Sequence, residues 1–310
     1  MTVPRSIGLV EVGPRDGLQN ESARLAPAVK VEFVRRAVAA GLKRIEVASF
    51  VSPRRVPQMA DAEEVMQALP RQAGVRYIGL VLNRAGFDRA AAAGCEEVGM
   101  VVFTTDTFNE RNQGTTSAGS IRAWRGIAAA AQAAGIRAQV TISAAFGCPF
   151  EGEVAPARVV DIAREIADGA PFEIAIADTI GVAVPGQVSE VFARVAEALP
   201  GMTLRGHFHN TRNTGLANAY AALMAGARTL DASLGGLGGC PFAPAATGNI
   251  PTEDLVYMLG RMGVETGVDL HRAIEAARWI EQQIGHPVPG MLLKAGSFPG
   301  AARPAAMTTA

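Results

Sequence analysis

An alternation of two kinds of segment runs through most of this chain and most constrains its fold. Short runs rich in Val and Ile are each followed by a longer, Ala-rich amphipathic stretch. Strands that alternate with helices are typical of a parallel sheet, because a connection between parallel strands has to cross back over the sheet. The predicted strands are residues 6–12, 44–48, 76–82, 98–103, 137–143, 173–177, 203–208 and 229–233.

The stretches between these runs have the spacing of amphipathic helices. They are residues 27–40, 61–69, 85–93, 121–134, 155–167, 187–199 and 216–225. Several end at a glycine, which favours the left-handed conformation that closes a helix. Eight such units in about 230 residues fit a closed (β/α)8 TIM barrel, which is the α/β fold we predict. The alternative is an open doubly wound sheet, in which one or two of the runs are not strands.

Nothing divides the chain, so we predict one TIM-barrel domain over residues 1–310. The barrel is expected at about residues 5–235, followed by an active-site lid loop at 235–249. Segments 252–262 and 270–284 have helical spacing, so we predict added helices within 252–285 that pack against the barrel. The small, polar tail at 300–310 is predicted to be flexible.

Charge and cysteine content exclude several kinds of partner and location. Lys and Arg number 29, and Asp and Glu number 29, so we expect no nucleic-acid partner and no binding to anionic membranes. No apolar run approaches the roughly 18 residues that a membrane span needs, and the first residues do not resemble a secretory signal. Cys95, Cys148 and Cys240 are widely spaced, which argues against a disulfide framework. These features predict a cytoplasmic protein.

The sharpest local signal is a His-Phe-His sequence at the end of the seventh run, formed by His207 and His209. Residues i and i+2 of a strand face the same side, so both imidazoles can converge on one point. Two structural histidines at a strand end are the alternative. Asp16 follows the first run and Asn249 the eighth, at the end of the barrel where catalytic residues gather. This nitrogen and oxygen set favours Mg²⁺ or Mn²⁺ and leaves Zn²⁺ open.

A glycine-rich stretch, GGLGGCP, follows the eighth run at residues 235–241. It does not match the nucleotide-binding pattern G-x-G-x-x-G, because Pro241 takes the place of the third glycine. Its backbone freedom is typical of a mobile lid. Cys240 is either a small buried apolar residue or a reactive thiol, and its place at the active face favours the thiol. We predict that Cys95 and Cys148 are structural.

Several motifs resemble those of one enzyme family. They are EVGPRDGLQNE at residues 11–21, SFVSP at 49–53, GCPFEG at 147–152, DTIG at 178–181, GLGGCP at 236–241 and GNIPTEDLVYML at 248–259. On these motifs the chain is identified as a member of the 3-hydroxy-3-methylglutaryl-CoA (HMG-CoA) lyase family. The resemblance covers nearly the whole chain.

The resemblance implies a metal-dependent TIM barrel that splits a 3-hydroxyacyl-CoA thioester into acetyl-CoA and a keto acid. It implies metal ligation by Asp16, His207, His209 and Asn249, the set reached above from residue types. It also implies an acyl-CoA thioester as the small-molecule partner and a homodimer. HMG-CoA itself, cleaved to acetyl-CoA and acetoacetate, is the expected substrate.

The resemblance also implies roles for individual side chains. It places the substrate-binding and catalytic arginine at Arg15, its acidic partner at Glu46 and the catalytic cysteine at Cys240. Arg15 would stabilise negative charge on the thioester oxygen, and Cys240 would protonate the enolate carbon. His207, Cys240 and a metal-bound water all qualify as the first base. We expect Glu46 and Asp178 to position the other groups.

Three further residues are predicted to bind substrate: Gln19 and Ser49, from the matching motifs, and Arg212. Arg212 lies in a departure from the family pattern, NTRNT at 210–214, where the family usually has Asp-Thr-Tyr-Gly-Gln. Its guanidinium would reach the pocket rim, and a solvent-facing side chain without a role is the alternative. This departure raises a paralogous lyase for another branched 3-hydroxyacyl-CoA. A Claisen-type condensing enzyme of the same superfamily competes with the lyase, as does a non-catalytic binder of metal or acyl-CoA.

Overall fold

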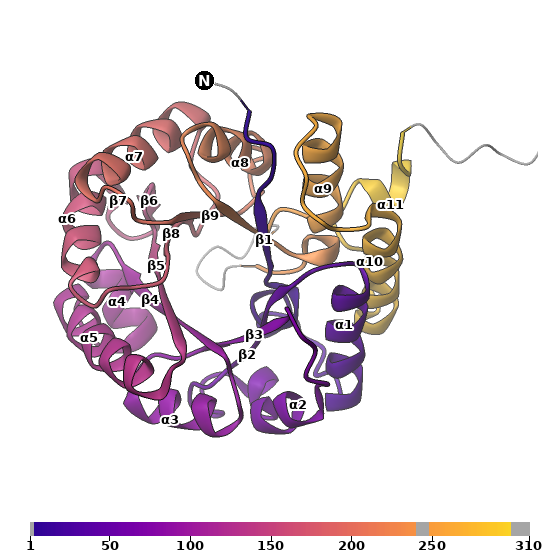
Figure 1. Ribbon diagram of the computed structural model, residues 1–310, viewed down its shortest axis with the longest axis horizontal. Coiled ribbons are helices and arrows are strands. Elements are labelled where there is room, and N and C mark those ends of the chain that lie inside the picture. The colour runs from indigo at the N-terminus through magenta and orange to yellow at the C-terminus, as the bar shows by residue number, and fades with distance from the viewer. Residues whose placement is uncertain (1–2, 240–247, 299–310) are drawn as a thin grey trace, which may run out of the picture.

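A computed structural model describes residues 3–239 and 248–298 and shows a closed barrel of parallel strands (Figure 1). The strands close in the order β1-β10-β9-β8-β5-β4-β3-β2. Their bounds are β1 Gly8–Glu11, β2 Arg44–Ser49, β3 Arg76–Leu80, β4 Glu97–Phe103, β5 Arg137–Ser143, β8 Ile174–Asp178, β9 Leu204–Phe208 and β10 Thr229–Ala232. Each predicted run overlaps a strand of this barrel, and the bounds of β2, β4 and β8 extend one residue beyond the prediction. The TIM barrel is confirmed, and the alternative of an open sheet is wrong.

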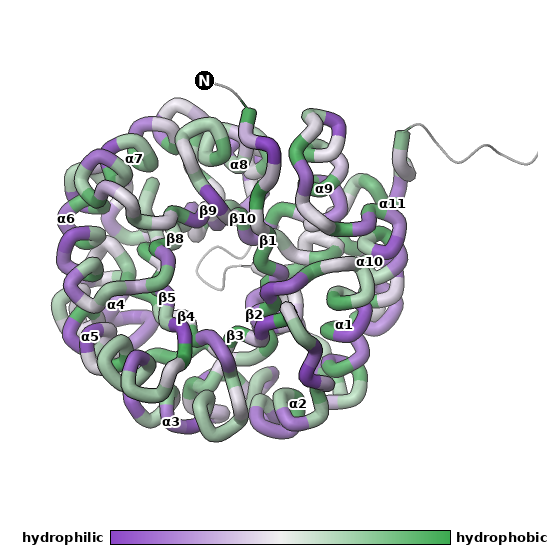
Figure 2. The backbone as a smooth tube through the Cα atoms, viewed as in Figure 1, coloured by the Kyte–Doolittle hydropathy of each residue, from purple (hydrophilic) through white to green (hydrophobic). Residues whose placement is uncertain are grey.

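Helices surround the barrel, and hydrophilic and hydrophobic stretches alternate along them (Figure 2). Between the strands lie α1 Pro27–Ala39, α2 Ala62–Ala68, α3 Arg84–Ala92, α5 Ser117–Ala134, α6 Pro156–Ala167, α7 Pro185–Ala198 and α8 Gly215–Met224. After β10 come α9 Thr252–Arg261 and α10 Leu270–Ile284, and α10 packs against α1. No helix among the described residues is long and apolar enough to cross a membrane.

Some short elements do not follow from the periodicity of the sequence. They are α4 Asp106–Gln113, α11 Leu292–Ala295, the hairpin of β6 Gly147–Cys148 and β7 Gly152–Glu153, and three turns, η1 Gly13–Gly17, η2 Pro57–Met59 and η3 Leu234–Gly236. Helix α4 reads DTFNERNQ and buries only Phe108 and Asn109, so it lacks the apolar stripe that predicts a helix. Helix α4 packs against β4 and α5, and α11 packs against α10.

The interior of the barrel is more polar than is usual for this fold, whose centre is dominated by Val, Ile and Leu. Arg44 on β2 pairs with Glu97 on β4 at 2.6 Å and with Glu173, just before β8, at 3.0 Å. These strands are not neighbours, so the three side chains meet only across the barrel axis. The aliphatic core lies instead between the strands and the helices. It includes the fully buried Trp124 and Phe192.

Candidate active site

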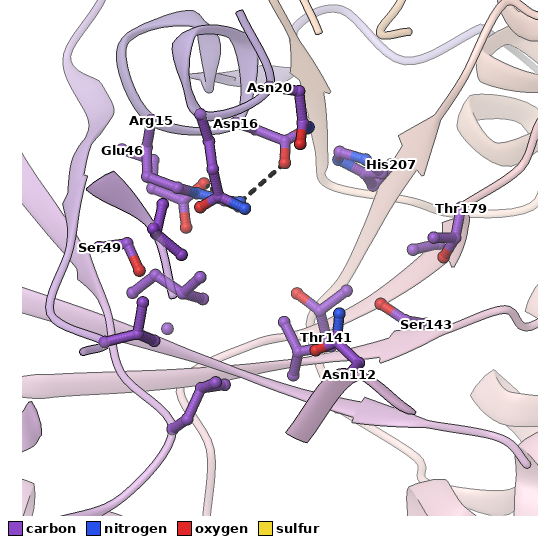
Figure 3. Close-up of a pocket in the computed structure, with 18 of the residues that line it drawn as sticks. Arg15, Asp16, Asn20, Glu46, Ser49, Asn112, Thr141, Ser143, Thr179 and His207 are labelled. Carbon is purple, nitrogen blue, oxygen red and sulfur yellow. Dashed lines mark hydrogen bonds and ion pairs between the residues drawn. The ribbon is translucent and has the colours of Figure 1, made fainter. Parts of the chain in front are cut away.

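A pocket with a volume of about 380 Å³ opens at the carboxyl ends of the barrel strands. Arg15, Asp16 and Glu46 lie together on one side of it, His207 lies beside them, and Thr141 lies on the opposite wall (Figure 3). Active sites of TIM-barrel enzymes lie at this end of the barrel. The predicted site residues at the ends of the first, second and seventh runs therefore share one pocket.

A tight turn after β1 carries Arg15 and Asp16 into the mouth of the barrel. This turn, η1, is a single π-helical turn in which the carbonyl of Val12 accepts the backbone N–H groups of Arg15, Asp16 and Gly17 at 3.2, 2.7 and 3.1 Å. A Cβ atom on Gly13 would lie 2.5 Å from Oε1 of Glu11. Only glycine fits at Gly13, and such turns often occur at functional sites.

Two carboxylates fix the guanidinium of Arg15. Nη1 lies 2.7 Å from Oδ1 of Asp16, and Nη2 lies 2.6 Å from Oε2 of Glu46. The Nε atom of Arg15 is buried and has no hydrogen-bond partner among the described residues. Charge-assisted pairs of this length hold a side chain firmly, so Arg15 presents an oriented positive charge to the pocket. This arrangement agrees with the prediction that Glu46 positions Arg15.

Asp16, His207 and His209 can hold a metal ion, because one donor atom of each lies within 4.8 Å of the others. Nε2 of His209 is 3.9 Å from Oδ2 of Asp16. Burial opposes ionisation of Asp16, but Arg15 and the two imidazoles outweigh it and lower the pKa to about 2. Burial and the charge of His207 lower the pKa of His209 to about 4. An ionised carboxylate and a neutral imidazole are the forms that bind metals, so these residues fit a divalent ion.

Asn249 contacts this cluster directly. Its Nδ2 atom donates to Oδ2 of Asp16 at 2.9 Å and to the carbonyl of Leu237 at 3.0 Å. The amide oxygen is the atom that could bind a metal, and that role stays a prediction. The contact with Leu237 also joins the predicted lid segment to the metal cluster.

Gln19 and Ser49 line the pocket, as expected for substrate-binding residues. Oε1 of Gln19 and Oγ of Ser49 are buried without a hydrogen-bond partner among the described residues. Buried polar atoms normally have partners, so two such atoms facing a pocket indicate a place for a polar ligand. The predicted contact with substrate stays a prediction.

Two predicted site residues lie elsewhere. Nη1 of Arg212 donates to the carbonyls of Ile180 and Gly181 at 3.1 and 2.9 Å, so the side chain ties two loops together and does not line the pocket. The carboxylate of Asp178 accepts the backbone N–H groups of Val182 and Ala183 at 2.9 and 3.0 Å. Asp178 therefore shapes the turn after β8. The roles of Arg212 in substrate choice and of Asp178 in positioning the site stay predictions.

The cysteines divide into two groups. Cys95 and Cys148 are buried and free. Burial raises the pKa of Cys95 to about 12, and Sγ of Cys148 lies 3.1 Å from Oγ1 of Thr105. Both agree with the structural roles predicted for them. Cys240, most of the lid loop around it and the tail at 300–310 lie outside the described residues.

Glu11 is a central residue of the site that the sequence did not single out. Its Oε1 atom accepts the backbone N–H groups of Gly13 and Leu234, each at 2.9 Å, and its Oε2 accepts the hydroxyl of Thr252 at 2.7 Å. It thereby joins the turn that carries Asp16, the root of the lid segment and the start of α9. A glutamate among the apolar residues of the first strand is the signal that could have indicated it.

The fold and the site define a TIM-barrel enzyme with a polar pocket at the carboxyl ends of its strands, where Asp16, His207 and His209 could hold a metal ion. The sequence pattern of the HMGL-like family matches residues 6–280, and the chain belongs to this family of carbon–carbon lyases. It acts on a CoA ester.

Known proteins resemble the chain along almost its whole length. It is 44% identical to an (R)-citramalyl-CoA lyase of Chloroflexus aurantiacus, over 94% of this chain and 95% of that one. It is 42% identical to a hydroxymethylglutaryl-CoA lyase of Pseudomonas mevalonii, over 91% and 93%. The structure of an HMG-CoA lyase from Acinetobacter baumannii in complex with coenzyme A and 3-methylmalate matches with a TM-score of 0.93. Its sequence is 37% identical, and the match covers 98% of this chain and 99% of that one.

Proposed function

We propose that the chain cleaves HMG-CoA to acetyl-CoA and acetoacetate with the help of a divalent metal ion, Mg²⁺ or Mn²⁺. One observation carries the proposal: Arg15 and the metal cluster meet through Asp16, which lies 2.7 Å from the guanidinium and 3.9 Å from Nε2 of His209. A positive charge for the thioester and a chelating site for the hydroxyl thus lie side by side in one pocket. Carbon–carbon cleavage of a 3-hydroxyacyl thioester needs both.

The bond changes define what each group must do. The C3 hydroxyl loses its proton and becomes a carbonyl, the C2–C3 bond breaks, and its electron pair passes to C2 and the thioester oxygen. The resulting acetyl-CoA enolate is then protonated at C2. A divalent ion held by Asp16, His207, His209 and Asn249 would supply Lewis-acid polarisation of the C3 hydroxyl.

Arg15 faces the charge that develops on the thioester oxygen, where an oriented donor stabilises the enolate. Glu46 and Asp16 hold its guanidinium in place and leave its buried Nε without a partner among the described residues. If His207 binds the ion through Nε2 and donates from Nδ1 to Asp231, which lies 3.1 Å away, its ring has no lone pair left for the hydroxyl proton. Cys240 is then the side chain that remains among the candidates for the first base. Cys240 stays our proposal for the acid that protonates C2, on the sequence resemblance alone.

Basic side chains at the rim support a CoA thioester as the substrate. Arg55 and Arg111 line the pocket, and neither forms an ion pair with a carboxylate among the described residues. The guanidinium of Arg111 lies 4.2 Å from the centre of the Phe150 ring, which orients it. Unpaired guanidinium groups at a pocket mouth are suited to phosphate.

(R)-Citramalyl-CoA is the second candidate substrate, because the 44% identical relative bears that name. It has the same tertiary hydroxyl and methyl group, but its carboxylate lies one methylene closer to the carbinol carbon. The same bond changes would give acetyl-CoA and pyruvate. The two candidates therefore differ in the keto acid released and share the chemistry proposed for the pocket.

A turnover assay with both thioesters tests the proposal. Purified protein with Mg²⁺ or Mn²⁺ is mixed with each thioester, and acetoacetate and pyruvate are measured, with a chelator as the control. We expect acetoacetate from HMG-CoA at the higher kcat/KM and no product with the chelator. A preference for (R)-citramalyl-CoA would replace the substrate and keep the reaction, and no product from a wider panel of 3-hydroxyacyl-CoA thioesters would overturn both.

The assembly and location also belong to this proposal. We propose a homodimer in the cytoplasm, on the family resemblance and on the cysteine content of the sequence. Sedimentation of the purified protein at several concentrations tests the dimer.

A further inference from the structure

The two imidazoles of the metal cluster have different surroundings. Nδ1 of His207 lies 3.1 Å from Oδ2 of Asp231 on β10. Nδ1 of His209 is buried and has no hydrogen-bond partner among the described residues. Of the two rings, and among residues 3–239 and 248–298, only that of His207 has a carboxylate at Nδ1. A carboxylate in this position fixes which ring nitrogen carries the proton and turns the other one toward a metal.

Asp231 is itself held from the other side. Its Oδ1 atom forms an ion pair with Nε of Arg205 on β9 at 3.3 Å, and the two side chains are 5% and 4% exposed. Neither atom has a hydrogen-bond partner among the described residues, so the attraction between these two groups is that of opposite charges. Arg205 in turn donates to Oε1 of Gln139 at 2.5 Å and lies 3.5 Å from Glu173. The carboxylate of Asp231 thus lies between the imidazole of His207 and the guanidinium of Arg205.

We propose that Asp231 is a positioning residue for the metal site, with Arg205 as its support. Asp231 accepts the Nδ1 proton of His207, so that Nε2 keeps its lone pair for the metal ion. Arg205 prevents the carboxylate from turning away and balances its charge in the barrel interior. This inference rests on the metal site of the proposed function, and it adds a second layer of residues below that site.

A purely structural role for Asp231 predicts a different outcome. In that case the carboxylate would serve only to neutralise Arg205, and its loss would lower stability without changing the metal site. The two roles predict different metal affinities when wild type and variant are compared at the same fraction of folded protein. They also separate in the protonation of the His207 ring, which needs no metal.

The first measurement is Mn²⁺ binding to the metal-free protein, for wild type, Asp231→Asn and Arg205→Lys. We expect Asp231→Asn to weaken Mn²⁺ binding by about 10- to 100-fold, the usual cost of losing an outer partner of a ligating histidine. The Mn²⁺ affinity of Arg205→Lys should lie between those of wild type and Asp231→Asn, because lysine keeps the positive charge but lacks the planar guanidinium group. The matched control is Glu97→Gln, a buried carboxylate that pairs with Arg44 and does not touch His207, with binding within about twofold of wild type.

The second measurement keeps the inference testable if a variant does not fold. Long-range ¹H–¹⁵N spectra of the four imidazoles in the metal-free wild type, at a pH where the rings are neutral, report which nitrogen of His207 carries the proton. We expect the proton on Nδ1. A proton on Nε2, or unchanged Mn²⁺ affinity in a folded Asp231→Asn variant, would overturn the inference. If wild type binds no Mn²⁺ at all, the proposed metal site fails, while the ring protonation still decides the role of Asp231.

Discussion

The two ends of the barrel interior contain the same kinds of charged side chain, but the atoms around those side chains differ. At the amino end of the strands, called the closed end here, Arg44 lies between Glu97 and Glu173. Glu173 also accepts the hydroxyl of Thr229 at 2.6 Å. At the carboxyl end of the strands, called the open end because the pocket lies there, Arg15 lies between Asp16 and Glu46 in the same way. The number of ion pairs does not distinguish a structural cluster from a functional one here.

The difference lies in the atoms left without partners. The open end has three buried atoms without a hydrogen-bond partner in the part of the chain that the structure describes: Nε of Arg15, Oγ of Ser49 and Nδ1 of His209. A pocket of about 380 Å³ lies beside them. Such atoms lose hydrogen bonds to water and gain nothing until a ligand arrives. The comparison teaches that unsatisfied groups, more than charge itself, indicate where this barrel binds something. Variants at one end of the barrel interior should therefore differ in effect from variants at the other end.

Removal of a metal ligand should have the largest effect. His209→Ala deletes one imidazole from the cluster, so we expect metal affinity to fall by more than about 100-fold, beyond the usual cost of losing an outer partner, and activity to disappear. Metal analysis of the purified variant measures this directly. His271→Ala, an exposed histidine at the start of α10, is the control and should behave as wild type. Full metal occupancy in His209→Ala would contradict the assignment.

Arg44→Met should damage the closed end and leave the open end working. It leaves Glu97 buried without its cation, which typically costs about 3–5 kcal/mol of stability, while Glu173 keeps its 3.5 Å contact with Arg205. Chemical denaturation of the variant measures the loss. We expect kcat of the folded fraction to stay within about twofold of wild type, far from the effect of losing a catalytic group. A large fall in kcat would mean that the two ends are not separable.

Arg15→Met should do the opposite. It removes the donor proposed to face the thioester oxygen, so kcat should fall by about 10²- to 10³-fold, as when one oxyanion donor is lost. Metal affinity should persist, because Asp16, His207 and His209 remain. Steady-state kinetics and metal titration together test this. Arg15→Lys keeps the charge without the fork and should recover only part of kcat.

Glu11→Gln tests the junction beneath the open end through pH. Burial raises the pKa of Glu11 from 4.5 to about 7, so the folded state holds this proton more tightly than the unfolded state does. Its contribution is present below pH 4.5 and is lost as pH rises through 7, by roughly 3 kcal/mol in total. Glu11→Gln removes this contribution, so its stability should decline less over that range. An unchanged pH profile of unfolding would contradict the raised pKa.

Arg111→Ala should have the smallest effect. The loss of one charge-assisted contact to a phosphate should raise KM for the CoA thioester by about tenfold. The same acyl group on pantetheine has no nucleotide phosphates, so its KM should not move. Arg122→Ala, an exposed arginine on α5, is the control. Equal changes in KM for both thioesters would place Arg111 at the acyl group instead.

The strands and the residues at their ends could be predicted from the sequence, but contacts between distant residues could not. The eight strands follow from short apolar runs, and His207, His209 and Asp16 follow from their places at strand ends. The chain of ion pairs from Arg44 to Asp231 could not be predicted, because Arg44 and Glu173 lie 129 residues apart and meet only when the barrel closes. The direction of Arg212 was equally inaccessible, since it depends on the two carbonyl groups that its loop happens to face.

The turn after β1 makes the order of two residues in the chain part of the catalytic design. Because the carbonyl of Val12 accepts three successive N–H groups, the backbone conformation at Arg15 and Asp16 is tightly constrained. The side chain proposed to face the thioester, Arg15, and the side chain proposed to bind the metal, Asp16, are consecutive, so neither can be moved without the other. Exchanging the two residues would conserve composition, charge and length and would still reverse which group faces which ligand. In an enzyme redesigned for another substrate, this dipeptide has to be transplanted as one unit together with its turn.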